Sequence, residues 1–489
     1  MTETVTLTGA RPFDGGEPVD LVLRDGIIAS IAPAGAAAAE GEIVDADGRF
    51  IGPGFWDAHV HFTQHVIRRR RVDLTETRSA ADVLDVVRRA RAGGAPLSDG
   101  MLMGYGFRDG LWPVPASLDA LDAVVSDVPV VLVSGDLHCG WMNRAAERRF
   151  GLALDETGLL REGPWIQLMH SFDEVSALPA DAYREAADAA AARGVVGIVE
   201  YENTDNVAEW SKRTANGLAS LRADIAVWPD RLESVIADGR RTGDVVDAQG
   251  LVTFGRLKVV VDGSLNTRTA WCWDPYPGMD PGHPHACGME SVPIPELRRL
   301  LERARGAGIE AAVHAIGDRA NTEVLDTFEA LGMKGVIEHA QLVRDEDFAR
   351  FAALELIASV QPEHAMDDRD VADRHWAGRT GRAFAFGSLH RSGAALRLGS
   401  DAPVAPLDPW VSLSAATARS RGDREAWHPE QRLPLDVALA ASVRTSLAVG
   451  QPADLVLTDR DPYASDRDEL RTMPVAATLL GGRFTWRTI

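Results

Sequence analysis

The middle of the chain alternates short apolar runs with helical segments, such as those at residues 295–307 and 319–331. The apolar runs predict eight strands, at residues 56–61, 195–201, 221–228, 257–262, 310–314, 336–339, 356–361 and 395–401. Strands that alternate with helices favour a parallel α/β architecture. Eight such units predict a TIM (β/α)8 barrel, whose active site lies at the carboxyl ends of its strands.

The two ends of the chain are rich in strand patterns instead. Residues 19–24 and 27–31 alternate around the turn signal Asp25-Gly26, and residues 42–50, 453–458 and 475–486 are also strand-like. Neither end alone is large enough to be stable, so they should pair with each other. We therefore predict a β-sandwich of residues 1–52 and 445–489, and a barrel domain of residues 53–444.

The gap between the first and second barrel strands is too long for a single helix. It spans residues 62–194 and contains strand-like segments at 101–105 and 129–134. We predict an inserted subdomain in this range, lying over the mouth of the barrel.

Composition limits the function classes. Hydrophobic residues make up 45% and charged residues 25% of the 489 residues, as in an ordinary globular enzyme. The formal net charge of −21 disfavours nucleic acid and anionic membranes as partners. No secretory leader pattern, long apolar run or cysteine framework is present in the sequence, so we expect a cytoplasmic enzyme with a small-molecule substrate; a homodimer is one option for its assembly.

Candidate metal ligands gather at the ends of the predicted strands. His59 and His61 are two residues apart and share one face of the first strand. Four more polar residues end or interrupt later apolar strands: Lys258, His314, His339 and Asp401. A single buried histidine is more often a hydrogen-bonded core residue, but a group of this kind on one barrel rim predicts a metal centre.

The motifs around these residues resemble those of the metal-dependent amidohydrolase superfamily. The resemblance is to its type-3 branch, which includes N-substituted formamide deformylases. It rests on PGFWDAHVH at 53–61, KVVVDGS at 258–264, VHAIGD at 313–318, EHAQ at 338–341, QPEH at 361–364 and GSDAPV at 399–404. The segment GQPADLVL at 450–457 is similar to that family's return to the β-sandwich.

The resemblance implies a binuclear centre, with two divalent ions, expected to be Zn²⁺, in each chain. His59 and His61 would bind one ion with Asp401, and His314 and His339 would bind the other. Lys258 would bridge both ions as a carboxylated lysine. The residues themselves leave open a site with one metal, in which Lys258 forms a salt bridge with Asp262 or Asp401.

The implied reaction is hydrolysis of an amide or N-formyl type C–N bond by a metal-bound hydroxide, with Asp401 as the general base. His364 could stabilise the oxyanion or could belong to the pocket wall. Deamination or the opening of a cyclic amide are alternatives at the same site. Deaminases of this superfamily generally use one metal. A regulatory protein that keeps the fold without turnover is a third alternative.

Several further residues are candidates for substrate contact. Residues 197–201, GIVEY, depart from the His-Asp usual in relatives, so Glu200 could replace that aspartate. His138 lies in a segment resembling one that reaches the pocket from the insert, and Arg419 could pair with a substrate carboxylate. Trp112 and Trp273 could line an apolar pocket or pack the insert against the barrel. Asp57 is expected to support the histidine pair, and Asp318 to cap a helix.

Overall fold

The computed structural model describes residues 4–36, 38, 40–107, 109, 112–134, 139–161, 164–165, 167–169 and 178–489. The chain divides into two compact units. One comprises Met1–Phe62 with Arg184–Ile489, and the other comprises Thr63–Tyr183. No helix among the described residues is long and apolar enough to cross a membrane.

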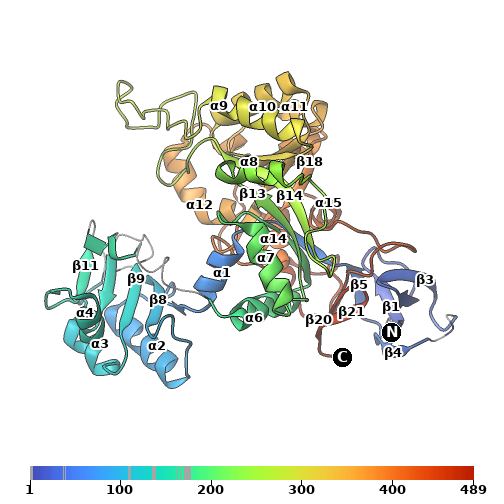
Figure 1. The fold of residues 1–489 in the computed structure, drawn as a ribbon, viewed down its shortest axis with the longest axis horizontal. Helices are drawn as coiled ribbons and strands as arrows, with labels where there is room; N and C mark the ends of the chain where they lie inside the picture. Colours follow the sequence, from blue (N-terminus) through green and yellow to red (C-terminus); the bar gives the residue numbers. More distant parts are fainter. Residues whose placement is uncertain are drawn as a thin grey trace. The chain divides into compact units, whose positions relative to one another are not determined.

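The first unit contains the predicted TIM barrel (Figure 1). Its parallel strands are β6 (Phe55–Val60), β12 (Val195–Glu200), β13 (Arg222–Val227), β14 (Val252–Val260), β15 (Ala311–Ala315), β16 (Gly335–His339), β17 (Ile357–Val360) and β18 (Ala395–Leu398). They are hydrogen-bonded in chain order, and a parallel bridge between Val60 and Ala402 brings the two outer strands together. The barrel is therefore nearly closed, with its strand ends at one rim.

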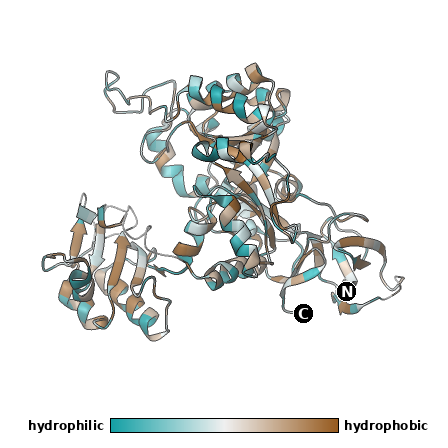
Figure 2. Cartoon of the chain, in the orientation of Figure 1, coloured by the Kyte–Doolittle hydropathy of each residue, from teal (hydrophilic) through white to brown (hydrophobic). Residues whose placement is uncertain are grey.

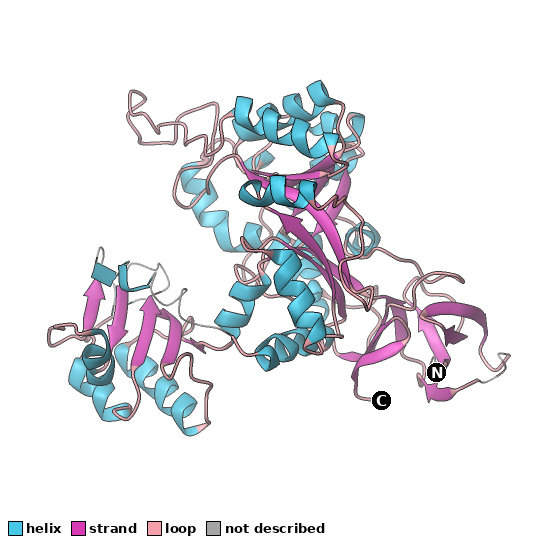
Figure 3. Cartoon of the chain, viewed as in Figure 1, coloured by secondary structure: helices cyan, strands magenta, loops and turns pink. Residues whose placement is uncertain are grey.

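Helices follow most of the barrel strands and face them with apolar residues (Figures 2 and 3). They are α6 (Ala180–Ala191), α7 (Asn206–Ala215), α8 (Leu232–Ala237), α9 (Ile294–Gly306), α10 (Asp318–Leu331), α11 (Phe348–Ala353), α12 (Pro362–His375), α13 (Phe386–Arg391), α14 (Pro409–Ala418), α15 (Leu435–Ala441) and α16 (Arg467–Arg471). The barrel strands are mostly buried, which explains why they read as continuous apolar runs.

Three local expectations need correction. β14 begins at Val252 rather than at 257, and β18 ends at Leu398, so Asp401 lies in the turn beyond the strand. Asp318 is not the N-cap of α10. Gly317 holds that position, while the Asp318 carboxylate accepts a hydrogen bond from the Trp273 backbone N–H at 3.0 Å.

Strands from both chain ends form one mixed sheet. They are β1 (Val5–Pro12), β2 (Val19–Arg24), β3 (Ile27–Pro33), β4 (Glu42–Asp45), β5 (Phe50–Pro53), β19 (Leu455–Thr458), β20 (Val475–Leu480) and β21 (Arg483–Arg487). β19 pairs with both β5 and β20, and the strands of the two chain ends enclose a shared core. The expected strands at 42–50 and 475–486 are each two strands, because Asp47-Gly48 and Gly481-Gly482 adopt the positive φ of tight turns.

The insertion after the first barrel strand is confirmed as a folded unit. Its sheet contains β7 (Val72–Asp73), β8 (Leu102–Phe107), β9 (Val130–Ser134), β10 (Cys139–Met142) and β11 (Leu159–Arg161). Its helices are α2 (Ala80–Ala92), α3 (Leu118–Val124) and α4 (Arg144–Phe150), and α1 (Phe62–Arg69) leads into it. Two apolar clusters of its own stabilise it. Its placement over the barrel mouth stays a prediction.

Candidate metal centre

Polar side chains from separate barrel strands line one cavity of about 290 Å³. Its walls include His59 on β6, Lys258 on β14, His314 on β15 and His339 at the end of β16. His61, His364 and Asp401 line the same cavity from the segments that follow β6, β17 and β18. Parallel strands in a closed barrel bring their carboxyl ends to one rim, so residues far apart in sequence meet there.

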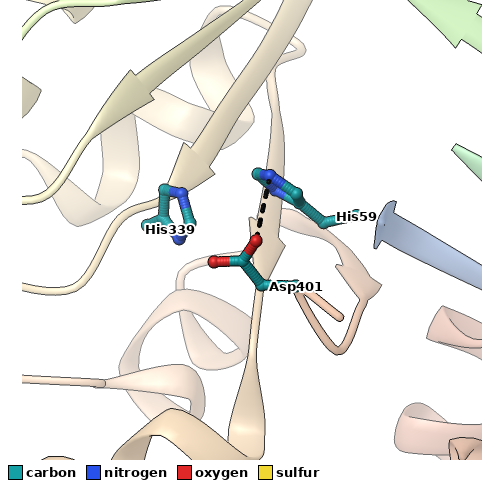
Figure 4. A group of neighbouring side chains, drawn as sticks. All are labelled: His59, His339 and Asp401. Carbon is teal, nitrogen blue, oxygen red and sulfur yellow. Dashed lines mark ion pairs between the residues drawn. The ribbon is translucent and has the colours of Figure 1, made fainter. Parts of the chain in front are cut away.

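The tightest cluster comprises His59, His339 and Asp401 (Figure 4). Each offers a ligand atom, and these atoms lie within 4.8 Å of one another. The His59 Nε2 is 3.6 Å from Asp401 Oδ1, and the His61 Nε2 is 3.4 Å from the same oxygen. The spacing and the nitrogen and oxygen donors suit a divalent transition metal such as zinc.

His314 lies beside this cluster, next to His339. The two ring centroids are 4.5 Å apart, and the His59 ring lies 4.9 Å from the His339 ring. His339 is therefore a neighbour of both sets of ligands that the family pattern implies.

Buried acceptors orient the two central histidines. The Glu338 carboxylate accepts from His59 Nδ1 at 2.7 Å and from the Tyr201 hydroxyl at 2.8 Å. His339 Nδ1 donates to the Gln361 side-chain oxygen at 2.9 Å. With Nδ1 protonated, each ring presents the lone pair of Nε2 to the cavity, as a metal ligand requires.

A second carboxylate ties the first barrel strand to the turn that carries Asp401. The Asp57 carboxylate accepts from the backbone N–H of His59 at 3.0 Å and of Ser400 at 2.9 Å. Asp401 itself has φ 56°, in the left-handed region. Burial raises the pKa of Asp57 to about 7, although the hydrogen bonds from Ser400 and His59 oppose this rise. The supporting role expected for Asp57 agrees with these contacts.

Burial also sets the charge of the histidines. It lowers the pKa of His59 and His339 well below the usual value and that of His314 to about 4. These rings are therefore neutral near pH 7 and can donate lone pairs. Burial would raise the pKa of Asp401, but the neighbouring imidazoles, His59 and His61 foremost, outweigh it and hold that pKa well below its usual value.

Lys258 has no counterion in this site. Its Nζ is buried, has no hydrogen-bond partner among the described residues, and lies 4.2 Å from the centroid of the Tyr201 ring. The alternative salt bridge to Asp262 is not formed, and that carboxylate accepts instead from the backbone N–H groups of Trp271 and Gly317, each at 2.8 Å. Burial lowers the pKa of Lys258, with Glu338 and Asp401 opposing this effect. An orphaned amine beside a histidine cluster fits a ligand or a modification that the protein atoms alone do not supply.

The structure does not bring Glu200 or Arg419 to this cavity. The Glu200 carboxylate is fully buried and accepts from the Phe62 backbone N–H and the Trp210 indole, each at 3.1 Å. The Arg419 guanidinium is also fully buried and donates to the carbonyl of Trp427 at 3.1 Å. These internal partners correct the expectation that either side chain contacts substrate.

The expected aromatic contacts also change. Trp273 is 41% exposed and packs against the Arg319 guanidinium rather than lining the cavity, where Trp228 lies instead. Trp112 belongs to the core of the inserted unit, with its ring centroid 5.8 Å from that of Trp141. Its contact with substrate stays a prediction, and His138 lies outside the described residues. Trp228 directly follows β13, so the strand-end rule that found the histidines could have found it.

A nearly closed parallel barrel with buried neutral histidines and a carboxylate at its carboxyl rim defines a metal-dependent hydrolase. The chain belongs to the amidohydrolase family, whose model matches residues 42–486. The protein is therefore a hydrolase of carbon–nitrogen bonds other than peptide bonds, with a candidate metal site at His59, His339 and Asp401.

Individual proteins agree with this assignment. The chain is 26% identical to the protein YtcJ of Bacillus subtilis (strain 168), over 91% of each chain. It is 25% identical to the N-substituted formamide deformylase of Arthrobacter pascens, over 92% of this chain and 90% of the other. Its fold matches the crystal structure of an uncharacterized metal-dependent hydrolase from Pyrococcus horikoshii OT3, with a TM-score of 0.78 and 25% identity over 95% of this chain and 99% of that one.

Replacing Glu338 with glutamine should weaken metal binding about 10–100-fold, the usual cost of losing a partner behind a metal-bound histidine. His59 and Tyr201 donate to different oxygens of Glu338, and a carboxamide replaces one of these oxygens with an NH₂ group that cannot accept. Competition with a chromophoric chelator measures the affinity. Glu302→Gln, at an exposed position of α9, is the control and should match the unchanged protein. Equal affinities in both variants would contradict the role of Glu338.

Proposed function

We propose that this hydrolase cleaves an amide or N-formyl type C–N bond of a small organic substrate at a two-metal centre. The observation that carries the proposal is the buried, unpartnered Lys258 amine beside four histidines and Asp401. The similarity to an N-substituted formamide deformylase over nearly the whole chain supports the bond type.

His59, His61 and Asp401 would hold one Zn²⁺, His314 and His339 would hold a second, and carboxylated Lys258 would be a ligand shared by both. Such ions polarise a substrate carbonyl and activate water as a nucleophile. The lowered pKa of Lys258, which follows from burial, supports carboxylation, because CO₂ adds only to the neutral amine and a proton is then released. The closeness of the His339 ring to those of both His59 and His314 supports a centre with two closely spaced ions.

Asp401 would act as the general base. Its pKa is held low, so it is ionised and can accept a proton from the attacking water at a carboxylate oxygen. The same carboxyl group then passes the proton to the leaving nitrogen. Its left-handed backbone conformation and the Asp57 contacts to the same turn support a fixed orientation.

His364 would bind the developing oxyanion. Its Nε2 is buried without a hydrogen-bond partner among the described residues and lies 3.8 Å from Asp401 Oδ2. The ring also lines the cavity, where the substrate carbonyl must lie near Asp401. A donor already held at that position would stabilise negative charge without reorganising during the reaction.

Elemental analysis of purified protein should find about two divalent ions per chain, as a bridged two-metal hydrolytic site requires. Lys258→Met removes the proposed bridge and should lower the content to about one. A content of one ion in the unchanged protein, with no mass increase from carboxylation, would reject the bridge and favour a mononuclear, deaminase-like reaction.

Metal-loaded protein should hydrolyse members of a panel of N-formyl and N-acyl amines, and Asp401→Asn should lower kcat about 10²–10⁴-fold through loss of a positioned base. Rates are compared per bound metal, because Asp401 also contacts the ligand cluster. Asp345→Asn, at an exposed position, is the control and should keep the full rate. No turnover of any amide by the fully loaded protein would contradict the proposal, as would a near-normal kcat in Asp401→Asn.

The substrate should carry an apolar or aromatic group that packs against the cavity wall formed by Trp228, Leu265 and Val404. Trp228→Ala should raise KM for bulky amides about 10-fold or more relative to formamide-sized ones. Trp273→Ala is the matched control, since that ring lies outside the cavity lining. A change of substrate preference in Trp273→Ala but not in Trp228→Ala would show that Trp273, and not Trp228, contacts the substrate.

A further inference from the structure

A second cavity, of about 150 Å³, lies inside the barrel near the amino ends of its strands. Residues from β6, β12, β13, β14, β16, β17 and β18 line it, and the segment after α15 contributes Arg444. The position of Arg256 places this cavity on the amino-terminal side of the metal centre along the barrel strands. Arg256 lies two residues before Lys258 on β14, so both side chains are on one face of that strand.

Three guanidinium groups line this cavity, and one of them lacks a carboxylate partner among the described residues. Arg444 directs both terminal nitrogens at Asp224 Oδ2, each at 3.3 Å, and Arg256 lies 3.9 Å from the same oxygen. Arg256 also pairs with Glu310 at 2.9 Å. Arg397 has no carboxylate partner within the described residues, and its bond is to the Leu396 carbonyl at 3.1 Å.

Glu338 also lines the cavity, but it forms no ion pair with an arginine among the described residues. Both of its oxygens already accept hydrogen bonds, from His59 and Tyr201. Arginine stays protonated under ordinary conditions, so Arg397 carries its charge in a partly buried space without a carboxylate partner among the described residues. Burial lowers the pKa of Arg397, as does the nearby charge of Arg256. The pKa of Arg444 is lowered by burial and by the other two arginines, although Asp224 opposes this.

We propose that this cavity is a binding site for a small oxyanion, held by Arg397 with Arg256 and Arg444. The planar guanidinium fork matches carboxylate-type and phosphate-type oxygens with two parallel hydrogen bonds. The ligand class is therefore bicarbonate, a short carboxylate or inorganic phosphate. The volume suits such an anion with accompanying water, and it excludes a large organic ligand.

The site is distinct from the metal centre, because none of its three arginines lines the cavity of about 290 Å³ that contains the metal centre. Tyr201 and Glu338 form the connection between the two. Both line the second cavity. Tyr201 contacts Lys258 and Glu338 contacts His59, which line the cavity of the metal centre. The proposal does not depend on the hydrolytic function, since it rests on the charged side chains of the second cavity alone.

The test measures the melting temperature and the binding isotherm of the metal-loaded full chain with sodium bicarbonate, acetate and phosphate. Sodium chloride at matched ionic strength is the reference. At ten times Kd, at least one oxyanion should raise the melting temperature by about 1–2 °C above chloride, as expected for a ligand of the folded state of a chain this long. The arm that responds identifies the source of the oxyanion.

Arg397→Met should weaken the binding about 10-fold or more, because it removes the guanidinium without a carboxylate partner. In chloride alone this variant should melt no lower than the unchanged protein, since an uncompensated partly buried charge is lost. Arg298→Met, at an exposed position of α9, should keep the full response. Asp224→Asn, which removes the competing carboxylate, should bind the anion more tightly.

The proposal is overturned if no oxyanion exceeds chloride. It is also overturned if Arg397→Met binds the anion as the unchanged protein does, because that result would put the anion at the metal centre. Should Arg397→Met fail to fold, Arg397→Lys provides the second measurement. It keeps the charge but loses the fork, so unchanged affinity in that variant would equally reject the site.

Discussion

The metal centre depends on one constraint, which is that each polar group inside the barrel must find a partner without water. Glu338 meets this constraint for two of them, because its carboxylate accepts from both His59 and Tyr201. It thereby fixes the orientation of the His59 ring, which belongs to the candidate metal-binding group. The Lys258 amine does not meet the constraint among the described residues, which is the observation behind the proposed modification. Arg397 has a carbonyl partner but no carboxylate, which is the observation behind the proposed anion site.

The backbone positions this chemistry through the junction of the first and last barrel strands. Asp57 on β6 accepts from the N–H of Ser400, and the Asp401 N–H donates to the His59 carbonyl at 2.8 Å. Asp401 and His59 are thus held by one set of hydrogen bonds across the point where the barrel closes. Changes at the junction should affect ligand geometry before they affect the rest of the fold.

The barrel, and the gathering of polar residues at its strand ends, could be predicted from the sequence because both follow from local pattern. Apolar runs give the strands, and the two-residue period places His59 and His61 together. Glu338, Tyr201 and Gln361 were missed as supporting groups, because their partners depend on which strands lie opposite one another across the barrel. Glu200 and Arg419 were misassigned for the same reason, since nothing local reveals the Trp210 indole or the Trp427 carbonyl that they contact. The prediction that Trp273 lines the cavity was wrong because a position in a loop does not show which way the side chain faces.

The pairing of β19 with β5 has a consequence for synthesis on the ribosome. Residues 50–53 emerge early, but their partner at residues 455–458 emerges only after the whole barrel has been made. Throughout that interval the edge of β5 that later pairs with β19 exposes unpaired backbone groups, which can associate with strands of other chains. A truncated chain that ends before residue 455 would leave that edge of β5 unpaired permanently. Such a product would be a substrate for chaperones and proteases even if its barrel had closed.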